Sequence, residues 1–272
     1  MTFERLEIPV AGATLVGDRW PGSGSPIVLL HAGVCDRRSW REVGELLAAD
    51  GWDVVAYDRR GFGEVPHAGR PFRHVDDLVA VIDAVSPAAP AWVVGSSMGG
   101  GVALDAALDA SERVAGLVLL APAVSGDPEP DDAIVIAETN GLAEAIDTAW
   151  TAGDLDACNR LEVHLWLDGP PEPEGRVSGP ARELALEMNR IVLANGESEL
   201  DGAGGIDAAS RLDEIAVPVV VACGELDVPS KVRRSAELAG SLRDGTHRAL
   251  PGRAHLPYLE APAEVAALIP RR

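Results

Sequence analysis

Lysine is almost absent from this chain. Its 272 residues include one, Lys231, so nearly all of the positive charge comes from arginine. The 23 Lys and Arg residues face 43 Asp and Glu residues, and the formal net charge at pH 7 is −20. Phosphate backbones and anionic lipid repel such an acidic surface. We therefore expect no nucleic acid and no membrane among the partners, and we interpret the acidity mainly as a source of solubility.

Cysteine is scarce as well. Cys35, Cys158 and Cys223 form an odd set with no CxxC spacing and no histidine at metal-ligand spacing. Structural disulfides and a zinc site are therefore not expected, and a reducing compartment fits the composition. We expect neither a metal nor an organic cofactor.

Long apolar runs are also missing. No segment approaches the ~18 apolar residues that a membrane span needs. The N-terminal sequence MTFERLEIPV has no basic region followed by an apolar one, so it does not resemble a secretory signal. The expectation is a cytoplasmic protein, either a monomer or a homodimer.

The residues that are present favour one α/β domain with an insertion. Short, Val-rich runs at 27–31, 53–57, 91–95 and 114–120 are bounded by Gly, Pro or Asp, as is typical of strands buried on both faces. Segments 39–49, 75–85 and 98–110 between them carry apolar residues at helical spacing. This alternation predicts a mostly parallel sheet covered by helices, preceded by an antiparallel hairpin at 6–10 and 13–19.

The alternation stops after Leu120. Helical patterns at 132–139, 142–151, 155–166 and 180–193 follow, separated by a Pro-rich turn at 169–175 and followed by a Gly-rich stretch at 202–205. Strand patterns resume at 217–223 and 246–250, with helices at 229–239 and 261–269. We therefore predict a first core segment at 1–124, a helical lid at 125–212 and a second core segment at 213–272.

A possible nucleophile follows the predicted strand at 91–95. Gly95-Ser96-Ser97-Met98-Gly99 matches G-x-S-x-G, with a strand before it and a helix after it, as a nucleophile elbow requires. Such a tight turn strains the central serine and projects its hydroxyl above the sheet. A serine also needs a base that takes its proton. The sequence thus predicts Ser97 as a nucleophile with a histidine close by.

His255 is the best placed histidine, because its loop follows the last predicted strand and reaches the same edge of the sheet. A histidine base needs a carboxylate that fixes its tautomer. Asp227, after the strand at 217–223, is the preferred carboxylate, while Glu225 and Asp127 are competitors. For the developing oxyanion we expect backbone N–H donors at Met98, where a helix begins, and at Gly33 in preference to Val34.

Five segments together resemble the α/β-hydrolase fold superfamily, in its lid-bearing serine esterase and lactonase branch. They are LLHAGVCDRRSW (29–40), YDRRGFG (57–63), GSSMGG (95–100), GELDVPS (224–230) and GRAHLPYLEAP (252–262). The resemblance implies an eight-stranded sheet, a helical lid after the sixth strand and a triad of Ser97, Asp227 and His255. It also implies that Gly33 and Met98 supply the oxyanion hole. Segment 161–170 is similar to a lid segment of 3-oxoadipate enol-lactonase-like proteins.

Two positions in the loop after the third strand depart from that pattern. Ala32 stands where relatives have glycine, and Gly33 stands where many carry a bulky apolar residue, which would widen the acyl side of the pocket. Within the lid we expect Trp150 and Met188 in the core, and we place Trp166 with Val34 on the substrate pocket.

The predicted function is hydrolysis of a small carboxylic ester or lactone through an acyl-enzyme. Two other classes stay open. The same triad could serve carbon–carbon bond hydrolysis or cofactor-free perhydrolysis, and a protein of this fold could use its pocket as a non-enzymatic receptor.

Overall fold

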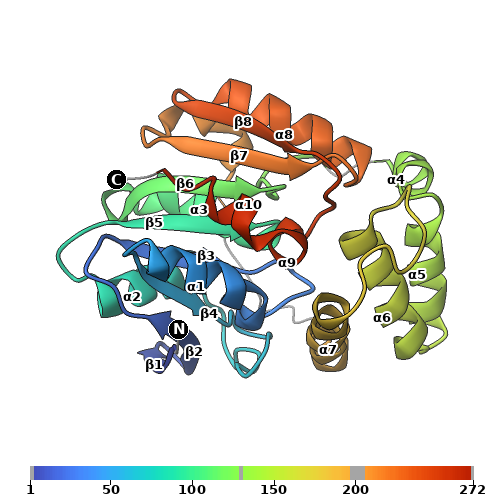
Figure 1. The fold of residues 1–272 in the computed structure, drawn as a ribbon, viewed down its shortest axis with the longest axis horizontal. Helices are drawn as coiled ribbons and strands as arrows, with labels where there is room; N and C mark the ends of the chain where they lie inside the picture. The colour runs from blue at the N-terminus through green and yellow to red at the C-terminus, as the bar shows by residue number, and fades with distance from the viewer. Residues whose placement is uncertain (1–2, 129–130, 197–205, 271–272) are drawn as a thin grey trace.

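The computed structural model describes residues 3–128, 131–196 and 206–270. Within them lies one eight-stranded sheet with the order β1-β2-β4-β3-β5-β6-β7-β8 (Figure 1). The strands are β1 (Glu4–Val10), β2 (Ala13–Trp20), β3 (Pro26–Leu30), β4 (Asp53–Tyr57), β5 (Ala91–Ser96), β6 (Val114–Leu120), β7 (Val219–Gly224) and β8 (Gly245–Leu250). The predicted architecture, a mostly parallel eight-stranded sheet flanked by helices, is confirmed.

Strand direction follows the hydrophobic pattern. All residues of β3 and β4 are buried, and the strands from β4 through β3, β5, β6 and β7 to β8 pair in parallel. The first two strands form an antiparallel hairpin, and β2 pairs antiparallel with β4. The edge strand β1 is mostly exposed, as expected for the outermost strand of such a hairpin.

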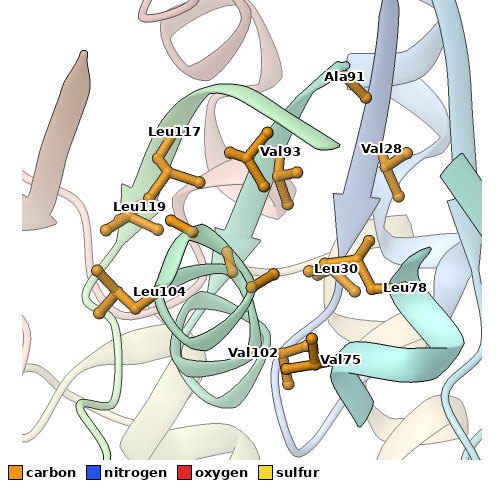
Figure 2. Packing of buried hydrophobic residues seen from close by; sticks show 14 of the residues in the cluster. Val28, Leu30, Val75, Leu78, Ala91, Val93, Val102, Leu104, Leu117 and Leu119 are labelled. Carbon is orange, nitrogen blue, oxygen red and sulfur yellow. The ribbon is translucent and has the colours of Figure 1, made fainter. Parts of the chain in front are cut away.

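Helices cover both faces of the sheet. On one face, α2 (His74–Val85), α3 (Met98–Asp109) and α8 (Pro229–Ser241) pack on a cluster that includes Val28, Leu30, Val93 and Leu117. Figure 2 shows Val75, Leu78, Val102 and Leu104 meeting these strand residues. On the other face lie α1 (Arg41–Ala49) and the short α9 (Pro257–Glu260) and α10 (Pro262–Ala266). These two cores fix the sheet whose loops carry the site.

A helical insertion separates β6 from β7. Its helices are α4 (Asp132–Glu138), α5 (Leu142–Thr151), α6 (Leu155–Val163), a π-helical turn (His164–Asp168) and α7 (Pro180–Asn195). Figure 1 shows them gathered beyond one end of the sheet, past the ends of the parallel strands. We call α4 to α7 the helical insertion. The limits 125 and 212 of a separate lid stay a prediction, and the Gly-rich stretch 202–205 lies outside the described residues. No helix in the described ranges is both long and apolar enough to cross a membrane.

Candidate active site

A sharp turn joins β5 to α3, and Ser97 lies at its apex with φ 51° and ψ −116°. Side chains have no room on either side of it. A Cβ on Gly95 would lie 2.4 Å from the carbonyl oxygen of Gly99, and one on Gly99 would lie 2.6 Å from that of Leu30. The Ser97 N–H donates to Leu120 at 2.9 Å, and the Ser97 carbonyl accepts from the N–H groups of Gly101 and Ala123. The backbone conformation of Ser97 is therefore held from several sides.

His255 and Asp227 form a buried pair. Nδ1 of His255 lies 2.7 Å from Oδ2 of Asp227, and each residue is 2% exposed. The other carboxylate oxygen, Oδ1, accepts from the N–H of Val228 at 2.7 Å. Because Nδ1 donates to the carboxylate, Nε2 of a neutral His255 is left as an acceptor. This is the tautomer that a general base needs.

The loops that carry this pair are bonded to each other. The N–H of Glu225 donates to the carbonyl of Leu250, and the N–H of Leu226 donates to the carbonyl of Arg253 at 2.9 Å. A Cβ on Gly224 would lie 2.2 Å from the Arg253 carbonyl oxygen, so glycine permits this close approach. The loops after β7 and β8 thus behave as one support for His255.

The two competing carboxylates lie elsewhere. Glu225 is exposed, and Asp127 accepts two hydrogen bonds from the Arg234 guanidinium, at 2.6 and 2.7 Å. Of the three acidic residues considered from the sequence, Asp227 is the one that the structure places against His255.

His31 has a structural environment. It is fully buried, its Nε2 accepts from the N–H of Arg59 at 3.1 Å, and its Nδ1 lies 2.8 Å from the carbonyl oxygen of Ala32. Burial and the neighbouring Arg59 charge hold the pKa of His31 well below its usual value. A neutral His31 therefore links the loops after β3 and β4. Asp58 strengthens the same region by accepting from the N–H groups of Arg37 and Glu64, both at 2.9 Å.

The loop after β3 lies beside the start of α3. Residues 32–35 form a turn, closed by a hydrogen bond from Cys35 N–H to the carbonyl of Ala32 at 3.2 Å. A Cβ on Gly33 would lie 3.7 Å from Cε of Met98. The N–H groups in the first turn of a helix have no intrahelical acceptor, and the helix dipole makes this end positive. Gly33 and Met98 are thus brought together, and the choice of Gly33 over Val34 as donor stays a prediction.

Tyr258 is a supporting residue that the sequence reasoning missed. Its ring stacks on Trp40, with centroids 4.2 Å apart, and its hydroxyl lies 3.7 Å from Sγ of Cys35. Burial raises the pKa of Tyr258 well above its usual value, so the hydroxyl stays protonated. Its position three residues after His255, in the AHLPYLE segment, is the signal that could have identified it. Tyr258 connects the His255 loop to the loop after β3.

A cavity of about 460 Å³ lies between this loop and the helical insertion. Its walls are mostly apolar and include two tryptophans, two carboxylates, an amide and a thiol. They are formed by Gly33, Val34, Val135, Thr139, Ala143, Ile146, Asp147, Trp150, Cys158, Glu162, Leu165, Trp166, Asn189, Val192, Leu193 and Gly196. The volume and the apolar walls with few polar groups are typical of small-molecule sites.

Trp166 joins the cavity to His255. Its ring lies 4.7 Å from the His255 ring, measured between centroids, and the Lys231 ammonium lies 5.8 Å from the Trp166 centroid. Met188 is buried, as expected, but the expectation for Trp150 is wrong. Trp150 is 45% exposed and lines the cavity, because the helix face that carries it is open to solvent there and not packed against a neighbour.

Two other lining residues have altered acidity. Burial raises the pKa of the Glu162 carboxyl, and it raises the pKa of the Cys158 thiol to about 11. Cys158 is therefore a thiol near pH 7, with little nucleophilic thiolate. Among the residues that the structure places, no group of three or more His, Cys, Asp or Glu side chains is arranged to hold a metal.

Known sequences are similar over most of the chain. The model of a family described as "Alpha/beta hydrolase family" matches residues 27–268. A pimeloyl-[acyl-carrier protein] methyl ester esterase of Neisseria meningitidis is 28% identical over 253 residues, 91% of this chain and 92% of the relative. "Putative carbamate hydrolase RutD" of Caulobacter vibrioides is 36% identical over 235 residues, 82% of this chain and 80% of the relative.

Solved structures share the architecture. An esterase from Thermogutta terrifontis superposes with a TM-score of 0.71 at 22% identity, covering 97% of this chain and 96% of its own. A bromoperoxidase from Bacillus anthracis superposes with a TM-score of 0.72 at 19% identity, covering 98% of each chain. At these identities the similarity concerns the fold, and the two different activities illustrate that the fold does not determine the reaction.

Proposed function

Because this chain belongs to the alpha/beta hydrolase family, we propose that it is a serine hydrolase that cleaves a small carboxylic ester or lactone through an acyl-enzyme. Ser97 is the nucleophile, His255 the base and Asp227 the carboxylate that orients it. The observation that carries the proposal is the strained Ser97 turn at the same sheet edge as the buried His255–Asp227 pair, whose Nδ1 and Oδ2 are 2.7 Å apart.

In the first step, Nε2 of His255 takes the Ser97 hydroxyl proton while Oγ attacks the ester carbonyl. Asp227 stabilises the imidazolium that forms and remains ionised. Its Oδ1 is already bonded to the Val228 N–H. This second contact keeps the carboxylate in place while the charge on His255 changes. The fixed geometry lowers the reorganisation that the proton transfer requires.

The tetrahedral oxyanion then lies against backbone N–H groups of Met98 and Gly33. Both belong to rigid turns, so they need no rearrangement when the charge develops. Removal of one such donor typically costs about 10²–10³ in kcat. Because both donors are backbone groups, substituting a side chain does not remove them. Their role is tested by substitutions that shift the backbone of these two turns.

Collapse of this intermediate breaks the carbonyl carbon–oxygen bond, and His255 donates its proton to the leaving alcohol. The acyl group stays on Ser97 Oγ. Water then loses a proton to His255 and attacks the acyl carbonyl, which releases the carboxylic acid and restores the Ser97 hydroxyl. For a lactone, the alcohol and the acid are the two ends of one product. The helical insertion serves as the lid of the cavity that holds the acyl part.

The test compares three proteins with p-nitrophenyl esters and a fluorophosphonate probe. Wild type should hydrolyse the esters and become labelled on Ser97, and Ser97→Ala should do neither. Ser96→Ala is the matched control, because the neighbouring Ser96 is fully buried and out of reach of the probe. It should still be labelled on Ser97. Equal circular dichroism spectra and melting temperatures would show that all three are folded.

Three results would overturn the proposal. Retained ester turnover in a folded Ser97→Ala protein would remove Ser97 from the mechanism. Labelling of Ser97 by the probe without turnover of any ester or lactone of graded acyl length would indicate a non-enzymatic receptor. Peroxide-dependent halogenation faster than ester hydrolysis would assign the same triad to perhydrolysis.

A further inference from the structure

The charged side chains that line the cavity are all of one sign. Its lining residues include Asp147 and Glu162 but no Lys, Arg or His. Asp147 is exposed, while Glu162 is half-buried within the helical insertion. In the ranges that the structure describes, neither carboxylate makes an ion pair, although most arginines there do. The cavity therefore presents negative charge to whatever it binds.

Glu162 is held in place by a chain of amides. Oε2 of Glu162 accepts from Nδ2 of Asn189 at 2.7 Å, and the same Nδ2 donates to Oδ1 of Asn159 at 3.0 Å. Nδ2 of Asn159 in turn donates to the carbonyl of Leu186 at 3.0 Å. This last bond fixes which end of the Asn159 amide is the oxygen. If the Asn189 amide were reversed, its oxygen would face both Oδ1 of Asn159 and Oε2 of Glu162, and neither contact could be a hydrogen bond. The network thus holds Oε2 of Glu162 against the Asn189 amide.

The network is incomplete. Asn189 is fully buried and lines the cavity, and its Oδ1 has no hydrogen-bond partner among the described residues. A buried carboxylate without a cation is costly, and so is a buried acceptor without a donor. The raised pKa of Glu162, caused first by desolvation, is consistent with this. Glu162 has one amide donor but no cationic partner in the described ranges, and Asn189 Oδ1 has no donor there, so a ligand that brings charged N–H groups would complete both.

The aromatic residues favour a cation among such ligands. Trp150 and Trp166 line the same cavity, and tryptophan faces attract ammonium groups within about 6 Å. Lys231 occupies such a position over Trp166 but is not one of the lining residues. The site thus combines a carboxylate with two tryptophans, and no basic side chain among the described residues lines it. These are the features that favour binding of an amine.

We propose that Glu162, positioned by Asn189, selects substrates that carry a primary ammonium group on the part remote from the reacting carbonyl. This inference rests on the proposed function for its catalytic part only, since the binding itself needs no turnover. The substrate class is an amino-substituted ester or lactone whose chain fits the cavity of about 460 Å³.

Binding is tested on the wild-type protein by calorimetry and tryptophan fluorescence with three probes of equal chain length. They are hexylamine, hexanol and hexanoate at pH 7 and constant salt. Hexylamine should bind at least about tenfold more tightly than hexanol, since hydrogen bonds between charged groups are the strong ones. Hexanoate should bind most weakly. Equal affinity for hexylamine and hexanol would overturn the inference.

Glu162→Gln should remove the preference, bringing hexylamine within about twofold of hexanol. Glu144→Gln is the matched control, because Glu144 is exposed on α5 and its loss changes the net charge equally. It should leave the affinities unchanged, and a similar loss there would assign the effect to overall charge. If Glu162→Gln does not fold, Glu162→Asp, which keeps the charge, should retain part of the preference, and a complete loss would contradict us.

Turnover separates this inference from the proposed function. Ethyl 6-aminohexanoate and ethyl heptanoate have similar length. Glu162→Gln should raise KM for the amino ester about tenfold and change its kcat by less than about twofold. For ethyl heptanoate, both KM and kcat should change by less than about twofold. Selective hexylamine binding together with an active Ser97→Ala protein would refute the proposed function alone. An inactive Ser97→Ala protein together with unselective binding would refute the role of Glu162 alone.

Discussion

Ser97 adopts a backbone conformation that glycine occupies more easily than serine, and replacing its side chain should reveal the strain. Its φ of 51° and ψ of −116° lie outside the regions that L-residues prefer. Such a conformation costs about 1–3 kcal/mol in a residue with a Cβ. Both Ser97→Ala and Ser97→Gly lack the hydroxyl, but only Ser97→Gly also removes the Cβ that causes the strain.

The expected difference follows from two opposing contributions. Glycine relieves about 1–3 kcal/mol of strain in the folded state, and it costs about 0.4–1 kcal/mol through greater freedom of the unfolded chain. Ser97→Gly should therefore be more stable than Ser97→Ala by up to about 2.6 kcal/mol, and by about 1.3 kcal/mol at the midpoint of the two ranges. For a chain of this size each kcal/mol moves the melting temperature by about 2–4 °C. The shift between the two variants is therefore a few degrees.

Urea denaturation and calorimetry of the two variants measure this difference without any contribution from catalysis. Ala236→Gly is the control, because Ala236 is exposed within α8 and its backbone is helical. There glycine should destabilise by about 1 kcal/mol. If Ser97→Gly were less stable than Ser97→Ala by as much as Ala236→Gly is less stable than wild type, the turn would store no strain, and the structural argument for a nucleophile elbow would fail.

Three further changes test other parts of the molecule. Asp227→Asn should lower kcat for a p-nitrophenyl ester by roughly 10⁴-fold with little change in KM, because the tautomer of His255 is no longer fixed; stopped-flow rates check this, and an unchanged kcat would exclude Asp227. Gly33→Phe should fill the acyl side of the cavity, since Gly33 lines it; a ratio of octanoate to acetate ester turnover that does not fall would contradict this placement. Burial lowers the pKa of His74 to about 3, so below about pH 6.5 the unfolded chain binds a proton that the folded chain does not. Stability is therefore fully present above pH 6.5 and lost as the pH falls, by at most about 1.4 kcal/mol per pH unit, and His74→Gln should flatten urea midpoints between pH 5 and 6.5.

The sheet could be predicted because its strands are short, apolar and sharply bounded. Segment 53–57 was expected from its composition and is β4, and the strand expected at 91–95 is β5, one residue longer. A short, continuous apolar segment bounded by turn residues fits a strand buried on both faces better than it fits a helix. Strand bounds are harder to predict at the edges of the sheet, where partly polar strands such as β8 carry a weaker hydrophobic pattern.

The site residues were easier to place than the cavity. Parallel strands end at one edge, so the order of motifs along the chain already brings the loops of Ser97, Asp227 and His255 together. No such rule applies to the helical insertion. The exposure of Trp150 and the network of Asn159, Asn189 and Glu162 depend on which helix faces meet, and helical periodicity does not determine that.

The distribution of arginine explains why the cavity of this acidic protein is itself negatively charged. In the described part of the chain, two buried arginines pair with carboxylates, Arg37 with Asp18 and Arg60 with Asp77. These ion pairs join loops of the fold. No described arginine lines the cavity, where Asp147 and Glu162 have no cationic neighbour among the lining residues. Hydrolysis of a neutral ester there would create a carboxylate among like charges, which favours its departure. The same negative field that should attract an amino-substituted substrate would thus promote release of an anionic product, and salt should weaken both effects together.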